Sequence, residues 1–463
     1  MMATPAAPAG QRADDRDGPR DPSAEGGRGG LRATLGGLTT RGRSFLAAGA
    51  AAAVCAYVLG QADLLRVGLL LAALPLICAL VLHRTRYRVA TSRRLTPQRV
   101  EAGTEARVQL RMENVSKLPT GLLMLQDHVP YMLGPRPRFV LDRVEAGGRR
   151  EVSYRVRSDL RGRFPLGPLQ LRLSDPFGMC ELTRSFSAYD TLTVVPRTTP
   201  LPAVRLGGEA SGYGDGQHRA LALAGDDDVI PRVYRHGDDL RRVHWRSTAR
   251  YGELMVRREE QPQRSHCTVL LDTRRAGYQG SGPDSAFEWA VSGAASVLTH
   301  MLERGYAVRL LTDTGAAVPG EGSDGYAGAS GGDSVETAGL LMDTLAIVDH
   351  SDGAGLSRAS DVLRTGSDGL LVAFLGDLDE EQAALAGRMR GRAGTAVAFL
   401  LDSGSWLTGG AVTGPVETRV RQLREAGWTV VPVPPGARPA DLWQQAAGEL
   451  RDGAGTDGHG GWA

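Results

Sequence analysis

The sequence predicts a multi-domain chain with a two-helix transmembrane hairpin, an all-β sandwich-like domain and a doubly wound α/β domain, in that order. Two long apolar runs near the N-terminus predict the hairpin, and alternating apolar and polar residues over 87–200 predict the β domain. Continuous apolar strands separated by amphipathic helices after residue 265 predict the α/β domain. A length of 463 residues is sufficient for several domains.

Residues 1–43 are predicted to form a disordered cytoplasmic tail. The segment is rich in Ala, Pro, Gly, Arg and Asp, and it has almost no large apolar side chain before Leu31. It therefore buries too little apolar surface to offset the entropy lost on ordering.

The region 44–83 is predicted to hold two transmembrane helices, over 44–62 and 64–82. Each apolar run is 19 residues long, which is about 28 Å of helix, or one hydrocarbon core. Gln61, Asp63 and Arg66 mark a tight turn between the runs. A signal peptide would need a short charged leader, and a buried soluble helix pair would not be apolar on all faces, so we favour the membrane hairpin.

The charges that flank the hairpin predict its orientation. Both flanks are rich in arginine and the turn is nearly neutral, which places both ends in the cytoplasm. These arginines would also contact the headgroups of the lipid bilayer. We therefore expect a multi-pass protein of the plasma membrane with its soluble domains and both termini cytoplasmic. The flanking arginines are Arg28, Arg32, Arg41 and Arg43 before the first span, and Arg84, Arg86, Arg88, Arg93 and Arg94 after the second.

The β domain is predicted over 87–200 because apolar residues recur at every second position. Runs of this kind cover 106–112, 151–157, 169–173 and 192–194, with Gly and Pro between them. Antiparallel strands in a small sandwich are the expected arrangement. A spacer or adhesion-type module without catalysis is the expected role.

Residues 201–264 are predicted to be a connector, and 232–261 within it is dense in Arg, His, Asp and aromatic residues. The pattern predicts a strand that ends near Tyr234, a helix capped by Asp238 or Asp239 with Leu240 and Val243 on one face, and a second strand over 254–256. Gly252 stands where a residue just past the helix end is expected. We expect the side chain of Trp245 to be buried in this connector.

The α/β domain is predicted over 265–450, followed by a flexible tail over 451–463. Strands are expected over 268–271, 307–311, 370–375, 396–401 and 429–433. Helices are expected over 284–304, 335–348, 357–364, 380–392 and 416–426, with a Gly/Ser-rich insert over 315–332. The alternation favours a parallel sheet wound on both faces.

The connector resembles the signature of the domain of unknown function 58 (DUF58) family. Two upstream segments resemble that family's preceding region, namely Arg161-Gly162-Arg163-Phe164-Pro165-Leu166-Gly167-Pro168 and Asp175-Pro176-Phe177-Gly178. The resemblance covers about residues 85 to 310. Its motifs are specific for the family but say little about a chemical reaction. The signature residues are Tyr234, Arg235, Gly237, Asp238, Arg241, Val243, Trp245, Ala249 and Arg250, followed by Leu254, Val256 and Arg257.

The first strand of the α/β domain ends in Leu270-Leu271-Asp272-Thr273, which resembles a von Willebrand factor type A domain. The metal site of that family opens with the pattern Asp-x-Ser-x-Ser. Here Arg274 and Ala276 stand at the two serine positions, so the resemblance implies a degenerate type A module. A guanidinium repels a divalent cation and alanine offers no oxygen, so we expect no metal at Asp272, although Asp313 and Asp377 also follow strands.

Composition and motifs argue against several classes of function. A net charge of +2 excludes a globally basic nucleic-acid binder, and the connector lacks aromatic stacking platforms. The sequence has no nucleophile elbow, Walker loop, zincin motif or dinucleotide fingerprint, so no cofactor is expected. Four cysteines without a disulfide framework favour a reducing compartment.

The resemblance to the DUF58 family implies a membrane-anchored, non-catalytic adaptor or scaffold. It also implies a MoxR-type AAA+ ATPase and other membrane proteins as partners, in membrane-protein maturation or cell-envelope processes. The alternative is a metal-dependent or hydrolytic enzyme that uses Asp272 and the region of His236 and His244, which lie eight residues apart. Hydrogen bonding within the connector is the simpler role for these two histidines.

Overall fold

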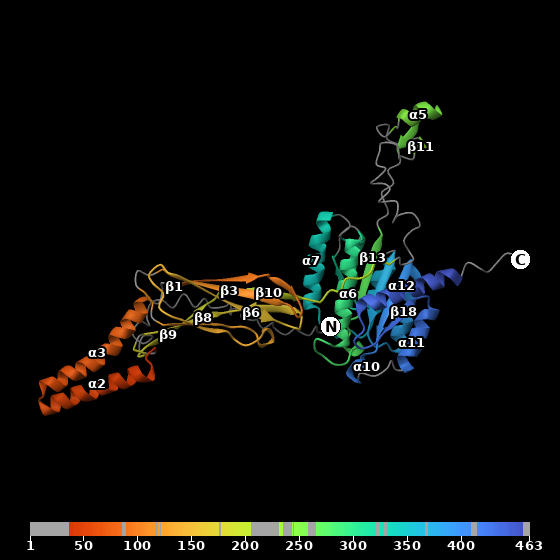
Figure 1. The fold of residues 1–463 in the computed structure, drawn as a ribbon. Helices are drawn as coiled ribbons and strands as arrows, with labels where there is room; N and C mark the ends of the chain where they lie inside the picture. The colour runs from red at the N-terminus through yellow and green to blue at the C-terminus, as the bar shows by residue number, and fades with distance from the viewer. Residues whose placement is uncertain are drawn as a thin grey trace, which may run out of the picture.

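The computed structural model has three structured regions in chain order, joined end to end (Figure 1). A hairpin of two helices is followed by a sheet-rich region, the β domain, and then by an α/β domain with a parallel sheet. Most of the predicted N-terminal tail lies outside the described residues. The structure describes residues 37–85, 89–115, 119–120, 122–175, 177–204, 231–234, 243, 245–257, 265–320, 325–327, 331–365, 369–408 and 414–456.

The hairpin consists of α2 (Thr40–Leu59) and α3 (Ala62–Thr85). Both helices are long and apolar enough to cross a membrane. The Thr39 hydroxyl caps α2 by accepting from the backbone N–H of Gly42, so this helix begins before the predicted Ser44. Gly60 ends it with a φ of 67°, which makes the tight turn that the sequence predicts.

The β domain contains strands β1 to β10, grouped in three sheets around one apolar core. The sheets have the orders β1-β3-β6, β2-β10-β7 and β5-β4-β8-β9. Every run with the predicted period of two is a strand; in β3, for example, Ala106, Val108, Leu110 and Met112 point into the core. The bounds are β1 (Val89–Thr96), β2 (Arg99–Glu101), β3 (Glu105–Asn114), β4 (Leu123–Asp127), β5 (Arg138–Leu141), β6 (Arg149–Arg157), β7 (Gly162–Leu166), β8 (Leu169–Ser174), β9 (Glu181–Phe186) and β10 (Asp190–Val195).

The connector contributes a small separate unit. Strand β11 (Pro231–Val233) pairs antiparallel with β12 (Met255–Arg257), and the short helix α5 (Trp245–Tyr251) lies between them. Gly252 follows the helix with a φ of 74°, and its N–H bonds to the carbonyl of Thr248, as expected of a residue past a helix end. The predicted helix start was wrong in one respect: Val243 lies in a β-bridge before the helix, not on its face.

The α/β domain is built on a six-stranded sheet of order β15-β14-β13-β16-β17-β18. All neighbours pair in parallel except the edge strand β15, which pairs antiparallel with β14. The bounds of the strands are β13 (His266–Leu271), β14 (Ala307–Thr312), β15 (Ala317–Val318), β16 (Leu370–Leu375), β17 (Thr395–Leu401) and β18 (Thr429–Val433). The bounds of the helices are α6 (Ala286–Glu303), α7 (Gly331–Ile347), α8 (Ser357–Thr365), α9 (Glu380–Met389), α10 (Ser403–Thr408), α11 (Gly414–Glu425) and α12 (Pro439–Thr456).

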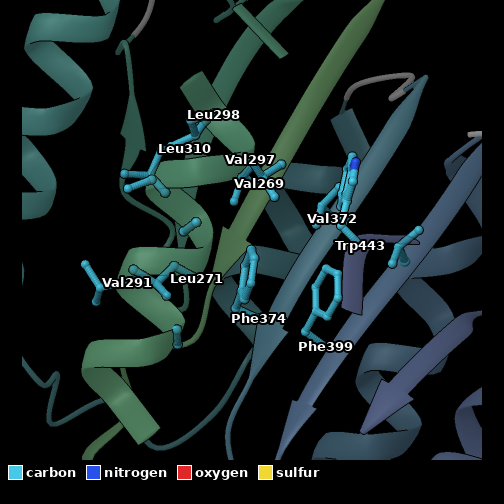
Figure 2. Packing of buried hydrophobic residues seen from close by; sticks show 14 of the residues in the cluster. Val269, Leu271, Val291, Val297, Leu298, Leu310, Val372, Phe374, Phe399 and Trp443 are labelled. Carbon is cyan, nitrogen blue, oxygen red and sulfur yellow. The ribbon is translucent and has the colours of Figure 1, made fainter. Parts of the chain in front are cut away.

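Apolar cores lie on both faces of this sheet, as the doubly wound prediction requires. On one face α6, α7 and α12 cover a cluster in which Phe374 stacks on Phe399 at 5.1 Å and Phe399 faces Trp443 (Figure 2). On the other face α8, α9 and α11 cover a second cluster. Gly293 lets α6 approach closely, because a side-chain carbon there would lie 2.5 Å from the ring of Phe374.

Helix α12 corrects the predicted C-terminus. The sequence predicts no element between the strand over 429–433 and the domain end at residue 450, and a flexible tail from residue 451, whereas α12 spans Pro439–Thr456. Leu442, Trp443, Ala446 and Ala447 form a buried stripe along this helix, and Pro439 stands at its first position, where its missing N–H costs nothing.

Candidate functional site

Three aspartates lie at the carboxyl edge of the parallel sheet, where α/β domains bind ligands. Asp272 follows β13, Asp313 follows β14 and Asp377 follows β16. The chain winds from β13 to β14 in one direction and from β16 to β18 in the other, so the winding reverses between β13 and β16. This reversal is the topological switch point of a doubly wound sheet. The structure therefore brings the predicted strand-end aspartates to the expected place.

Asp272 is engaged by Arg274, which lies two residues further along the chain. Nε of Arg274 donates to Oδ1 at 2.9 Å, and Nη2 donates to Oδ2 at 2.7 Å. The backbone N–H groups of Arg274 and Gly376 also donate to the carboxylate, at 3.0 Å and 3.2 Å. The two side chains are 4% and 0% exposed. The guanidinium thus occupies both oxygens that a metal ion at this carboxylate would need.

Burial and pairing act in opposite directions on this pair. Burial raises the pKa of Asp272 above its ordinary value, while the hydrogen bonds from Arg274 lower it. Burial also opposes the charge of Arg274, but its hydrogen bonds to Asp272 outweigh that effect and raise the pKa of the guanidinium. Each of the two charged groups can therefore be buried without a large desolvation penalty only because the other is its partner.

Asp313 and Asp377 are also engaged within the chain. Oδ1 of Asp313 accepts from the backbone N–H of Thr273 at 2.9 Å and from the hydroxyl of Thr273, and Oδ2 accepts from Ser351 at 2.6 Å. Oδ1 of Asp377 accepts from the N–H of Ser403 at 3.2 Å, and Oδ2 accepts from its hydroxyl. Burial raises the pKa of Asp377 despite these bonds.

Two further features lie at this edge. A cleft of about 260 Å³ lies beside Asp377 and is lined by Asp402, Arg419 and apolar side chains. The hydroxyl of Tyr278 is buried and has no hydrogen-bond partner among the described residues. Burial also raises the pKa of Tyr278 well above its ordinary value, so this hydroxyl stays neutral. Within the described ranges, no group of three His, Cys, Asp or Glu side chains could hold a metal ion.

The predicted signature of the connector is described only in part. Tyr234, Trp245, Ala249 and Arg250 are described, whereas Arg235, Gly237, Asp238 and Arg241, together with His236 and His244, lie outside the described residues. The backbone N–H of Tyr234 donates to the carbonyl of Leu254 at 2.7 Å, which closes the β11–β12 ribbon.

The predicted burial of Trp245 was wrong. Its side chain is 71% exposed at the start of α5, and Tyr251 at the other end of the helix is exposed as well. An apolar side chain contributes little to folding when water still reaches most of its surface. This tryptophan is therefore a surface feature of the connector and not part of a core.

Arg161 links the β domain to the α/β domain, a role that the sequence interpretation missed. Its guanidinium pairs with Glu288 on α6, donates to the carbonyl of Val348 at 2.5 Å and lies 5.2 Å from the ring centre of Phe287. The side chain is almost fully buried. The Arg161–Pro168 segment carries the family resemblance, but no local pattern in it indicates a partner so distant in the chain.

The segment after α7 joins this interdomain contact to the aspartate edge. His350 packs its ring against Phe287 at 4.0 Å. The next residue, Ser351, donates its N–H to the carbonyl of Thr273 at 2.7 Å and its hydroxyl to Asp313. Bonded and packed groups therefore run without a break from Arg161 of the β domain to the strand ends that carry the aspartates.

Comparison with known proteins finds a family model that resembles the central part of the chain. Residues 231–329 match the model of the family described as "Protein of unknown function DUF58". The "Uncharacterized protein YeaD" of Bacillus subtilis (strain 168) is 26% identical over 276 residues, which cover 55% of this chain and 64% of that protein. The chain thus spans slightly less than two thirds of the length of this relative.

Two solved structures show only distant likeness. The CARDB domain of the PF1109 protein from Pyrococcus furiosus has 8% identity and a TM-score of 0.17, over 24% of this chain and 90% of that one. The putative ApaA protein from Bordetella pertussis has 13% identity and a TM-score of 0.18, over 24% of this chain and 94% of that one. Scores this low establish no common fold. The likeness to known proteins therefore rests on two findings, the match of residues 231–329 to the DUF58 model and the similarity to the Bacillus relative.

Proposed function

We propose that this protein is a membrane-anchored, non-catalytic adaptor whose α/β domain is a degenerate von Willebrand type A-like module. It works with a MoxR-type AAA+ ATPase in membrane-protein maturation or cell-envelope processes, as its resemblance to the DUF58 family implies. The antiparallel edge strand β15 and the aspartates at the carboxyl edge are compatible with a type A-like module.

The observation that carries this proposal is the engagement of Asp272 by Arg274. A hydrolytic or metal-dependent site needs a carboxylate that is free to bind a cation or to accept a proton. Both oxygens of Asp272 accept hydrogen bonds from the guanidinium, and the oxygens of Asp313 and Asp377 accept bonds from Thr, Ser and backbone groups. This arrangement supports a binding role over the enzyme alternative at Asp272.

Membrane anchorage by α2 and α3, with both termini and the soluble domains in the cytoplasm, is part of the proposal. The arginine-rich flanks support this orientation. Cys180 and Cys267 are too buried to report sidedness, so the test uses a cysteine introduced at the exposed Ala62, the residue of α3 next to the hairpin turn, and another at the exposed Ser281. An impermeant thiol reagent added to intact cells should label Ala62→Cys and not Ser281→Cys. Labelling of Ser281→Cys from outside would overturn the orientation.

The exposed side of α5 is the proposed partner surface. Trp245 and Tyr251 present aromatic area to solvent, and Arg250 adds a positive charge beside them. Exposed Trp and Arg side chains are frequent anchors in protein interfaces.

Affinity purification from native membranes, with and without ATP, tests the partnership. We expect an AAA+ ATPase to copurify with the wild type and to be lost with Trp245→Ala. Tyr131→Ala is the matched control, because Tyr131 is an aromatic residue 85% exposed on the β domain. Equal capture of the ATPase by both variants would mean that α5 is not the partner surface. A hydrolytic activity that Asp272→Ala abolishes would favour the enzyme alternative over the adaptor.

A further inference from the structure

The turn between β8 and β9 is bonded to the base of the helical hairpin. The backbone N–H of Thr39, the capping residue of α2, donates to the carbonyl of Met179 at 2.9 Å. The Thr39 hydroxyl donates to the carbonyl of Gly178 at 2.7 Å, and Leu38 pairs with Cys180 in an antiparallel bridge. The residues Phe177–Cys180, here the hinge turn, therefore form a continuous unit with the residues that start α2.

Side-chain packing extends this contact to both helices. Met179 and Cys180 are buried in one apolar cluster with Leu38 and with Cys78 and Ala79 of α3. Gly42, in the first turn of α2, is so close that a side-chain carbon there would lie 2.2 Å from the carbonyl oxygen of Met179. The hinge turn is thus fixed at the level of the first turn of α2.

The length of α2 determines how deep this level lies in a membrane. The helix has 20 residues, which is about 30 Å and matches the thickness of one hydrocarbon core. A bilayer that covers α2 must therefore extend to its first turn. The residues in contact with Thr39 and Gly42 then lie at the boundary between hydrocarbon and headgroups.

Phe177 is the member of the hinge turn that faces outward. Its side chain is 60% exposed, while Met179 and Cys180 are buried. The carboxylate of Asp175 holds the turn in place by accepting from the N–H groups of Phe177 at 3.2 Å and Cys180 at 2.7 Å. The turn therefore presents an aromatic ring from a fixed backbone at the membrane boundary, the depth at which aromatic side chains gather in membrane proteins.

The charges around the hinge turn fit an anionic surface. Arg41 and Arg43 are exposed on the first turn of α2, and a side-chain carbon at Gly178 would lie 3.8 Å from Nη1 of Arg41. The nearby Glu181 is paired with Arg172 at 3.4 Å. The face around Phe177 is therefore net positive, and basic residues at this depth attract anionic lipid headgroups.

We propose that the hinge turn is a third contact with the membrane, in which Phe177 inserts among the headgroups of an anionic bilayer. This contact fixes the β domain at the membrane surface, in addition to the covalent link through α3. The inference rests on the membrane anchorage proposed above and extends it from the helices to the β domain.

Photocrosslinking in proteoliposomes tests the proposal on the full chain. The photoreactive residue p-benzoylphenylalanine replaces Phe177, Tyr189 or Leu70 in separate variants, which are reconstituted in vesicles of phosphatidylglycerol and alkyne-tagged phosphatidylcholine. Tyr189 is the matched control, because it is also an aromatic residue 60% exposed on the β domain. Strand β9 has six residues and carries the chain about 20 Å away from the hinge turn before Tyr189. Leu70, exposed in the middle of α3, is the positive control for lipid contact.

We expect lipid adducts at positions 177 and 70 and no lipid adduct at position 189. A lipid adduct at position 70 without one at 177 would overturn the inference and leave the anchorage intact. A crosslinked dimer in place of a lipid adduct at 177 would assign this face to a second copy of the chain, and would also overturn it. Absence of lipid adducts at position 70 would refute the proposed anchorage, and the inference with it.

Discussion

Among the described residues, two buried arginine–aspartate pairs are equal in burial and different in position. Arg93 pairs with Asp127 in the β domain and Arg274 pairs with Asp272 at the carboxyl edge of the α/β sheet, and in each pair the side chains are 4% and 0% exposed. Arg93 also bonds to Asp190 and to the carbonyl of Leu166, so it ties together segments that are distant in the chain. Arg274 bonds mainly to the aspartate two residues before it.

The difference shows that the same chemistry serves two purposes. In the β domain the pair crosslinks β1 to β4 and to the start of β10, so it holds the fold together. At the switch point the guanidinium bonds mainly to a carboxylate of its own turn, and the pair reaches another segment only through Gly376 and Asp377 after β16. It lies where a ligand would meet the carboxylate. The first pair is a structural tie, and the second is an internal occupant of a site.

The largest expected effect follows from the loss of the structural tie. Arg93→Ala should lower the free energy of unfolding by about 4 kcal/mol, because it leaves the fully buried carboxylate of Asp127 without a cation. Calorimetry of the purified protein in detergent would measure it, with the exposed neighbour Arg94→Ala as control. If both variants unfold at the wild-type temperature, the pair is not a tie.

Arg274→Ala should lower the free energy of unfolding by a smaller amount, about 3 kcal/mol. The backbone N–H groups of residue 274 and Gly376 still donate to Asp272 in this variant, so part of the support remains. The exposed Arg275→Ala is the control.

This loss should also depend on pH. Burial raises the pKa of Asp272, and loss of the Arg274 guanidinium removes the side-chain hydrogen bonds that lower it. A carboxyl whose pKa is raised by folding favours the fold at low pH and loses that contribution as the pH rises through the folded value. The penalty of Arg274→Ala should therefore shrink as the pH is lowered from about 8 to about 5. A penalty that grows on acidification would contradict this account of the pair.

Arg161 extends the comparison to a buried arginine between two domains. Arg161→Ala should cost about 2 kcal/mol, because it leaves Glu288 and the carbonyl of Val348 without their donor. Hydrogen exchange should show faster exchange in the segment 348–352 and at the end of β14, and no change in the hairpin. The exposed Arg163→Ala should leave both regions unchanged, and a uniform change throughout the chain would point to general destabilisation.

The smallest effect on the free energy of unfolding is expected for the exposed Trp245. Trp245→Ala should change the free energy of unfolding by no more than about 0.5 kcal/mol, because solvent already reaches most of the ring. Chemical denaturation of the purified protein is the measurement. A loss of several kcal/mol would mean that Trp245 is packed in solution, as the sequence interpretation expected.

Sequence reasoning succeeded where local pattern determines structure. The predicted strands over 370–375 and 429–433 coincide with β16 and β18. Over 370–375 an unbroken apolar run lies between Gly369 and Gly376, which leaves little choice of ends. The close approach of Arg274 to Asp272 was also within reach, since two residues after a strand end cannot be far apart.

Sequence reasoning failed where structure depends on distant partners. Nothing near Arg161 indicates that it inserts between Phe287 and Val348, and a tryptophan carries the same apolar area whether it is covered or exposed, as Trp245 illustrates. The hinge turn is a third example: Asp175-Pro176-Phe177-Gly178 is recognisable as a motif in the sequence, but its contact with Thr39 appears only in the fold.

Because Arg274 occupies the place of a cation at Asp272, we expect the native protein to bind no divalent ion there. Calorimetric titration of the purified protein with Mn²⁺ tests it directly, with Arg274→Ala in parallel. We expect no site-specific heat with the wild type, and binding to Arg274→Ala that also restores part of its lost thermal stability. Micromolar binding to the wild type that Asp272→Ala abolishes would contradict the claim and favour the enzyme over the adaptor.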